Sequence, residues 1–162
     1  MNRFIRKRQP KLGRIAAVTA QNFNADDFIR ATRPLEQKGF AVSVVSNTSG
    51  MLTGRTESGQ DVNFVPASTI GDMEFDRYCA LVLPGNSHGI SESAQAAIEK
   101  FMSEGKPVIA MSGDVPMLAE AANSPDVADA GVAISMNGKV FAARGDEASD
   151  EAVEVFAQAL VA

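Results

Sequence analysis

The stretch Lys106-Pro-Val-Ile-Ala-Met-Ser112-Gly-Asp-Val-Pro116 joins a short apolar run to the start of a predicted helix. The apolar run, Val108 to Met111, is typical of a buried parallel strand, and the helix predicted from Asp114 to Ala122 begins almost at once. In such sheets, ligands bind at the carboxyl ends of the strands. Ser112 therefore stands on a tight strand-to-helix turn, where a helix start favours negative charge and where enzymes hold nucleophiles.

Strand and helix signals alternate on both sides of this stretch. Buried strands are expected at 15–20, 41–45 and 79–83, and hairpins at 52–56 with 62–65 and at 132–135 with 139–143. Helices are expected after Asn24, which can cap the first one before Gly39 closes it, from 91 to 104, and from about Ser149. Pro34 lies inside the first helix and predicts an irregular last turn. The alternation predicts a three-layer α/β sandwich, a mostly parallel sheet with helices on both faces. We expect an arm at 1–13 and a single domain at 14–162.

Composition limits the class of protein. The 162 residues are 45% hydrophobic with ordinary glycine and proline content, which indicates a globular domain. Apolar runs reach only about half a dozen residues, so no membrane span and no secretory signal are expected. The single cysteine, Cys79, rules out an internal disulfide framework and favours a cytoplasmic location. Within its apolar run, Cys79 is interpreted as a small core residue.

Charge is unevenly distributed along the chain. Six basic residues and no acid lie in the first fourteen positions, while the rest carries nine basic and twenty acidic residues. A basic arm can contact nucleic acid or anionic lipid, but we expect a solvated terminus that lies across its own acidic surface. The acidic body has no basic stripe or aromatic platform, so nucleic-acid binding is not expected as the main function.

Once these elements are placed, residues 14 to 161 resemble the DJ-1/PfpI family of the class I glutamine amidotransferase-like superfamily, which has a flavodoxin-like sandwich. The resemblance rests on the order and spacing of four stretches. They are Val18-Thr-Ala-Gln-Asn-Phe-Asn24, Phe75-Asp-Arg-Tyr-Cys-Ala-Leu-Val-Leu-Pro-Gly85, Phe101-Met-Ser-Glu-Gly-Lys-Pro-Val-Ile-Ala110 and Asn137-Gly-Lys-Val-Phe-Ala-Ala-Arg-Gly145.

The resemblance also locates the family's working residues and shows where this chain departs from them. Family members carry cysteine and then histidine at the elbow, in a pattern like Ala-Ile-Cys-His-Gly-Pro, where this chain has Ser112 and Gly113. Asn24 matches the glutamate that hydrogen-bonds the cysteine. Pro84-Gly85-Asn86 matches a Pro-Gly-Gly turn whose amides help to form an oxyanion site. The segment between Ala122 and Gly131 is shorter than is usual in the family.

These departures change the chemistry that is available. A serine hydroxyl does not ionise near neutral pH, cannot follow the oxidation chemistry of a thiol, and needs a general base. His88 is the chain's one histidine and can serve as that base if it approaches Ser112. Asp114 or an acid of the Asp26-Asp27 loop would then orient it, and the Gly85 and Gly113 N–H groups would bind the oxyanion. Alternatively, His88 lies exposed in a glycine-rich loop or caps the following helix.

Our primary hypothesis is a cytoplasmic, non-catalytic module that binds a small ligand or serves in an oligomer. Ser112 and His88 are its candidate catalytic residues if it is an enzyme, and its candidate binding residues are Asn24, Gly85, Asn86, Gly113 and Asp114. The alternatives are a serine-dependent hydrolase or amidase, and the protease, chaperone or glyoxalase-like activities that the resemblance implies. A homodimer is expected as the family's common state. No cofactor or metal is expected, since no phosphate loop, dinucleotide fingerprint or metal-spaced His/Cys cluster occurs.

Overall fold

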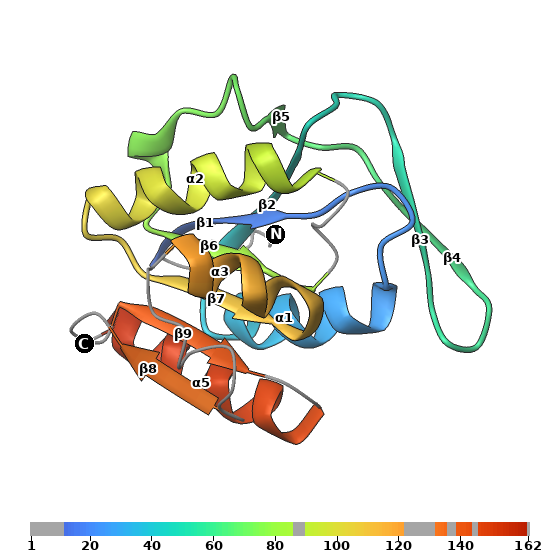
Figure 1. Cartoon of the computed structure of the whole chain (residues 1–162). Coiled ribbons are helices and arrows are strands. Elements are labelled where there is room, and N and C mark those ends of the chain that lie inside the picture. Colours follow the sequence, from blue (N-terminus) through green and yellow to red (C-terminus); the bar gives the residue numbers. More distant parts are fainter. Residues whose placement is uncertain (1–11, 86–89, 122–131, 136–138, 144–145, 162) are drawn as a thin grey trace, which may run out of the picture.

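The computed structural model describes residues 12–85, 90–121, 132–135, 139–143 and 146–161, and its strands lie in one main sheet with a separate hairpin (Figure 1). The main sheet has seven described strands in the order β5-β2-β1-β6-β7-β9-β8. Their bounds are β1 (Gly13–Val18), β2 (Phe40–Ser46), β5 (Ser68–Thr69), β6 (Ala80–Leu83), β7 (Val108–Met111), β8 (Val132–Ser135) and β9 (Val140–Ala143). Only the β8–β9 pair is antiparallel among these strands, so the predicted, mostly parallel sheet is confirmed.

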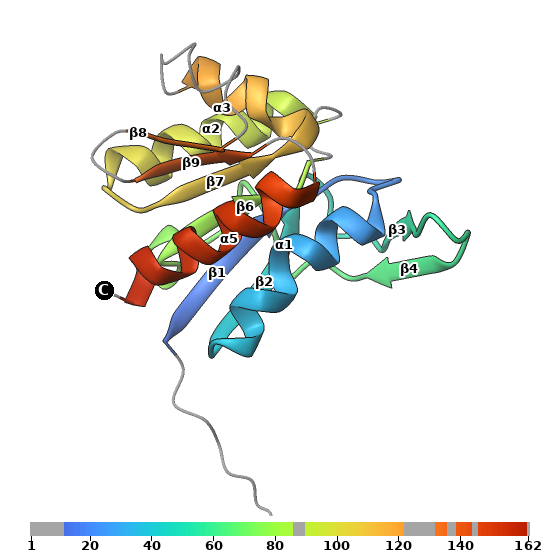
Figure 2. The same ribbon diagram turned by 90° about the horizontal axis from the view of Figure 1, so that it is seen from below.

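Helices cover both faces of this sheet. The helices are α1 (Ala25–Gln37), α2 (Ser91–Ser103), α3 (Val115–Ala121) and α5 (Asp146–Val161), with short 3-10 turns η1 (Phe75–Arg77) and η3 (Ser112–Asp114). Figure 2 shows α1 and α5 together on one face, and α2 and α3 pack against each other on the opposite face. Each face encloses its own apolar cluster, one containing Phe101 and Leu118 and the other Phe28 and Phe156. The predicted three-layer α/β sandwich is confirmed.

The two central strands explain why the middle layer is stable. Every residue of β6 and β7 is buried, because an interior strand of a parallel sheet is covered on both faces. Leu83 of β6 lies opposite Ala110 of β7, so these strands end side by side. The elbow strand and the strand before Pro84-Gly85 are therefore neighbours, and the two loops that follow them start at the same edge.

Helix α1 forms for reasons visible in its sequence. Asn24 caps it by accepting the Asp27 N–H at 3.0 Å, as predicted. Phe28, Thr32 and Leu35 share its buried face, and Gly39, with φ of 109°, ends it. The helix continues through Pro34 to Gln37 instead of ending at an irregular turn, because the Leu35 side chain is fully buried and holds the last turn against the sheet.

Both predicted hairpins are confirmed, and one helix start is corrected. β3 (Leu52–Arg55) pairs antiparallel with β4 (Asp61–Phe64) in a ribbon beside the main sheet, and β8 pairs antiparallel with β9. The last helix begins at Asp146, three residues before the predicted Ser149, because acidic residues are favourable in a first helical turn. The short strand β5 was not predicted, since its two residues carry no pattern.

Candidate functional site

The strand-to-helix turn after β7 has the predicted form. β7 ends at Met111, Ser112 opens the η3 turn directly, and α3 starts at Val115. The backbone at Ser112 therefore lies at the carboxyl edge of a central strand, between the ends of β6 and β9. This edge is where a parallel sheet leaves backbone groups available to a ligand.

Asp114 connects this turn to the neighbouring loop. Its residue surface is 0% exposed, and its Oδ2 accepts the Gly85 N–H at 2.8 Å. Gly85 follows β6 after Pro84, so the hydrogen bond joins the ends of two adjacent strands. A carboxylate is rarely buried without such a partner, because removing it from water is costly. Asp114 therefore acts as a clamp within the candidate site.

Gly113 and Gly85 bring the two backbones into close contact. A Cβ placed on Gly113 would lie 2.8 Å from the Gly85 carbonyl oxygen, a distance that real Cβ atoms do not show. Gly85 itself has φ of 127°, a conformation that side chains disfavour. The turns thus fit together only because both positions are glycine, and the structure brings Gly85, Gly113 and Asp114 together.

One role expected at this point differs from what the structure shows. The Gly85 N–H, expected to bind an oxyanion, is already donated to Asp114. The Asp114 carboxylate accepts that N–H with Oδ2, and its expected role in orienting a histidine stays a prediction. Sequence alone did not reveal this hydrogen bond, because it depends on the rotamer of Asp114 and on the position of Gly85 in the loop after the neighbouring strand.

The first loop supports the hairpin rather than the elbow. Asn24 is exposed, caps α1 through its side-chain oxygen and forms an isolated backbone bridge with Arg55. The Asp26 carboxylate accepts the Glu57 N–H at 2.7 Å, which fastens the hairpin turn to α1. These hydrogen bonds give Asn24 and Asp26 structural roles, and a binding role for Asn24 stays a prediction.

His88 and Asn86 lie outside the described residues, and the description of Ser112 is confined to its backbone. The predicted pairing of Ser112 with His88 and the predicted binding role of Asn86 therefore stay predictions. Pro84 and Gly85 are the last described residues before that loop, and they leave β6 next to the Ser112 turn.

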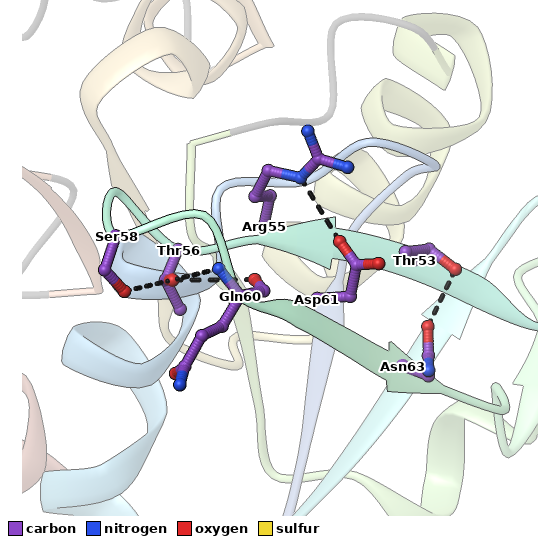
Figure 3. Close-up of polar contacts among 7 residues, drawn as sticks. All are labelled: Thr53, Arg55, Thr56, Ser58, Gln60, Asp61 and Asn63. Atoms are coloured by element: carbon purple, nitrogen blue, oxygen red, sulfur yellow. Dashed lines mark hydrogen bonds and ion pairs between the residues drawn. The ribbon is translucent and has the colours of Figure 1, made fainter.

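The hairpin carries a polar row that the sequence prediction missed (Figure 3). Thr53 donates to Asn63 at 2.8 Å, Arg55 pairs with Asp61 at 3.2 Å, and Thr56 contacts Ser58 at 2.9 Å. Alternating polar residues on both strands were the available signal. The Arg55 and Asp61 side chains are 71% and 56% exposed, so this pair contributes little to stability. We assign the row to hairpin register rather than to catalysis.

Cys79 lies directly before β6, at the opposite end of the paired strands β6 and β7 from the Ser112 turn. Its N–H donates to the Arg14 carbonyl at 2.8 Å. Burial raises the pKa of its thiol above the ordinary value of 9.0, and its own backbone hydrogen bond and the Lys106 charge only partly oppose this. Within the described ranges, no three His, Cys, Asp or Glu side chains are grouped so that they could hold a metal ion.

We expect the Cys79 thiol to be alkylated slowly. At about pH 8, reaction with iodoacetamide should be roughly tenfold slower in the native chain than in the urea-unfolded chain, because burial disfavours the thiolate and limits access. Mass spectrometry reads the rate directly, since the chain has one cysteine. A native rate equal to the unfolded rate would contradict the packing of the half-buried Cys79 side chain against the core.

Comparison with known proteins identifies the family. The model of the DJ-1/PfpI family matches residues 13–160, nearly the whole chain. The chain belongs to the DJ-1/PfpI family. A search of the curated proteins gives no significant match.

Solved structures share the fold at low sequence identity. The ThiJ/PfpI domain protein from Brachyspira murdochii has a TM-score of 0.74 and 16% identity, with 94% of this chain and 98% of that chain covered. Drosophila melanogaster DJ-1beta has a TM-score of 0.71 and 17% identity over 91% of this chain and 90% of that one. A two-domain protein from Anabaena variabilis has a TM-score of 0.74 and 19% identity, with 91% of this chain and 50% of that chain covered. It contains DJ-1/ThiJ/PfpI-like and ferritin-like domains.

Proposed function

We propose that this chain is a DJ-1/PfpI domain without the family's cysteine chemistry, and that it serves as a non-catalytic module that binds a small ligand or takes part in an oligomer. In this proposal Ser112 occupies the position of the elbow cysteine. The observation that carries it is the buried Asp114 carboxylate, which accepts the Gly85 N–H at 2.8 Å.

This arrangement disfavours both the stabilisation of an oxyanion and the ionisation of a nucleophile at the elbow. Acyl transfer needs N–H donors that are aimed at the charge developing in the transition state. Here the Gly85 N–H already binds a carboxylate oxygen of the protein itself. A buried carboxylate at this turn also disfavours a second negative charge beside it. A serine hydroxyl, which ionises far less readily than a thiol, is poorly suited to such a site.

The rest of the chain is consistent with a module. The one cysteine, Cys79, stands before β6, and burial raises its pKa, so it does not replace the missing elbow thiol. In the two-domain relative, the same fold is combined with a ferritin-like domain. None of the helices in the described ranges is both long and apolar enough to cross a membrane. We propose a cytoplasmic location and a homodimer, as the cysteine content and the family suggest.

A fluorophosphonate probe tests the proposal. We expect no labelling of the native protein and no difference between it and Ser112→Ala, because a serine without an aligned base and a free oxyanion donor does not attack phosphorus. A known serine hydrolase in the same reaction controls for probe quality. Labelling that disappears in Ser112→Ala would contradict the proposal and establish the serine-hydrolase alternative. His88→Ala would then test whether the histidine is the base.

A further inference from the structure

The outer side of α1 carries two adjoining grooves that the functions above do not use. The first, of about 530 Å³, lies between α1, Glu57 of the hairpin turn and Asp150 of α5. The second, of about 380 Å³, lies between α1, the β2 strand and the end of β4. Ile29 and Arg33 line both grooves, so they form one surface, which we call the α1 groove. Figure 2 shows α1 between α5 and the hairpin on this side.

The β2 edge of this groove is open in the described part of the chain. β5 pairs only with Val45 and Ser46, and the Ala67 N–H reaches the Val44 carbonyl at 2.8 Å. Backbone groups of alternate residues face the same neighbour, so the Val42 N–H and carbonyl point away from β1 and toward this edge. Segment 40–44 contains no charged residue and no proline, the usual features that protect an edge strand.

The groove beside this edge has apolar side chains at one end and mostly acidic side chains along the rest of its lining. Phe28 and Phe64 lie 4.7 Å apart between ring centroids, and Val65 is 72% exposed. Four carboxylates and two guanidinium groups line the two grooves. They are Asp26, Glu36, Glu57 and Asp150 against Arg30 and Arg33. Arg30 pairs with Asp150 at 3.4 Å, so the excess negative charge favours a basic occupant with apolar side chains.

The N-terminal segment of the same chain has this composition. Residues 1–11 contain five basic residues, no acid and the adjacent pair Phe4-Ile5. The chain enters the described region at Leu12, whose N–H donates to the Gly39 carbonyl at 3.2 Å. Gly39 lies between α1 and β2, three residues after Glu36 of the groove. The segment therefore starts at one end of the α1 groove.

The length of the segment is sufficient. The seven residues from Leu12 back to Ile5 span up to about 24 Å when extended. The strand from Phe40 to Val44 rises about 13 Å. We propose that residues 1–11 bind in the α1 groove of their own chain and cover the open edge of β2. Their apolar pair meets the Phe28, Phe64 and Val65 end, and their positive charges meet the carboxylates. This inference does not depend on the reactivity of Ser112.

Disulfide cross-linking in the full chain tests this placement. In a Cys79→Ser background, Ile5→Cys is combined with Val65→Cys in the groove, or with Val161→Cys as a control at the end of α5. Val161 is a matched valine, 52% exposed and outside both grooves. Mild oxidation should give about tenfold more intrachain disulfide with Val65 than with Val161, because binding raises the local concentration. About 0.5 M NaCl, or Glu36→Lys with Glu57→Lys, should reduce this preference.

Equal cross-linking at both positions would overturn the proposal, and so would disulfide-linked dimers in place of the intrachain product, because they would assign the groove to a second copy.

A second measurement needs no introduced cysteine. Arg6→Glu, Lys7→Glu and Arg8→Glu together should speed amide exchange in segment 40–44 about tenfold, since an uncovered edge exchanges faster. Lys139→Glu, an exposed charge reversal outside both grooves, is the control. Unchanged exchange in the triple variant would also overturn the proposal.

Discussion

Replacing Asp114 with alanine is expected to lower the free energy of unfolding by about 2 to 3 kcal/mol, because it leaves the Gly85 N–H without its acceptor and removes a fully buried side chain. Asp114→Asn keeps an acceptor oxygen of the same size and should cost less than about 1 kcal/mol. Urea denaturation followed by circular dichroism measures both values. Asp76→Ala, at an exposed aspartate, is the control and should change little.

The two Asp114 variants separate packing from charge. If Asp114→Asn destabilises as strongly as Asp114→Ala, the carboxylate charge and not the acceptor geometry holds the Gly85 turn. If neither variant destabilises, the clamp between the β6 and β7 loops has no energetic role, and the observation behind the proposed function is lost.

The same substitution tests the effect of Asp114 on the elbow. In a Cys79→Ser background with Ser112→Cys, adding Asp114→Asn should speed alkylation of the introduced thiol at neutral pH about tenfold. Removing a nearby negative charge favours the thiolate. The alkylation rate measured as a function of pH reports the fraction of thiolate at position 112. Asp76→Asn in the same background is the control. An unchanged rate would mean that the Asp114 charge does not disfavour ionisation at position 112.

The sequence was sufficient to predict the sheet because its central strands are buried on both faces. Continuous apolar runs such as Val108–Met111 and Ala80–Leu83 are too short for a buried helix, so they indicate strands that are buried on both faces. Helix ends were harder to predict, as at Asp146, because a possible capping serine and an acidic first turn indicate different starting residues. The two residues of β5 were beyond prediction, since they form a strand only through their pairing with β2.

Only the juxtaposition of Gly85, Gly113 and Asp114 could be predicted from the sequence, and their hydrogen bonding could not. Parallel strands that end together brought Gly85, Gly113 and Asp114 to one place, as the order of elements implies. Whether Asp114 faces a ligand or the Gly85 N–H depends on a distance of 2.8 Å, which no pattern of residue types encodes. The α1 groove was missed for a similar reason, because it is formed by side chains of a helix, a strand edge and a hairpin.

Gly54 of β3 shows the same dependence on close approach, and its replacement should have a large effect. A Cβ at Gly54 would meet the Phe23 ring and lie 2.5 Å from the Phe23 carbonyl oxygen. Phe23 is 2% exposed and stacks on Phe64 at 5.3 Å, and its carbonyl accepts the Arg55 N–H at 3.1 Å. Neither the ring nor the backbone can move away without breaking these contacts.

Gly54→Ala is therefore expected to lower the free energy of unfolding by about 3 kcal/mol, the upper range for an overpacked site. Gly71→Ala is the matched control, because a Cβ there meets nothing within 4 Å. It should be neutral or slightly stabilising, since alanine reduces the freedom of the unfolded chain. Urea denaturation measures both, and amide exchange should show the loss concentrated in β3 and β4. An equal effect of the two variants would mean that the hairpin is not fixed by contact with Phe23. Other contacts would then hold the hairpin in the position from which Glu57 lines the α1 groove.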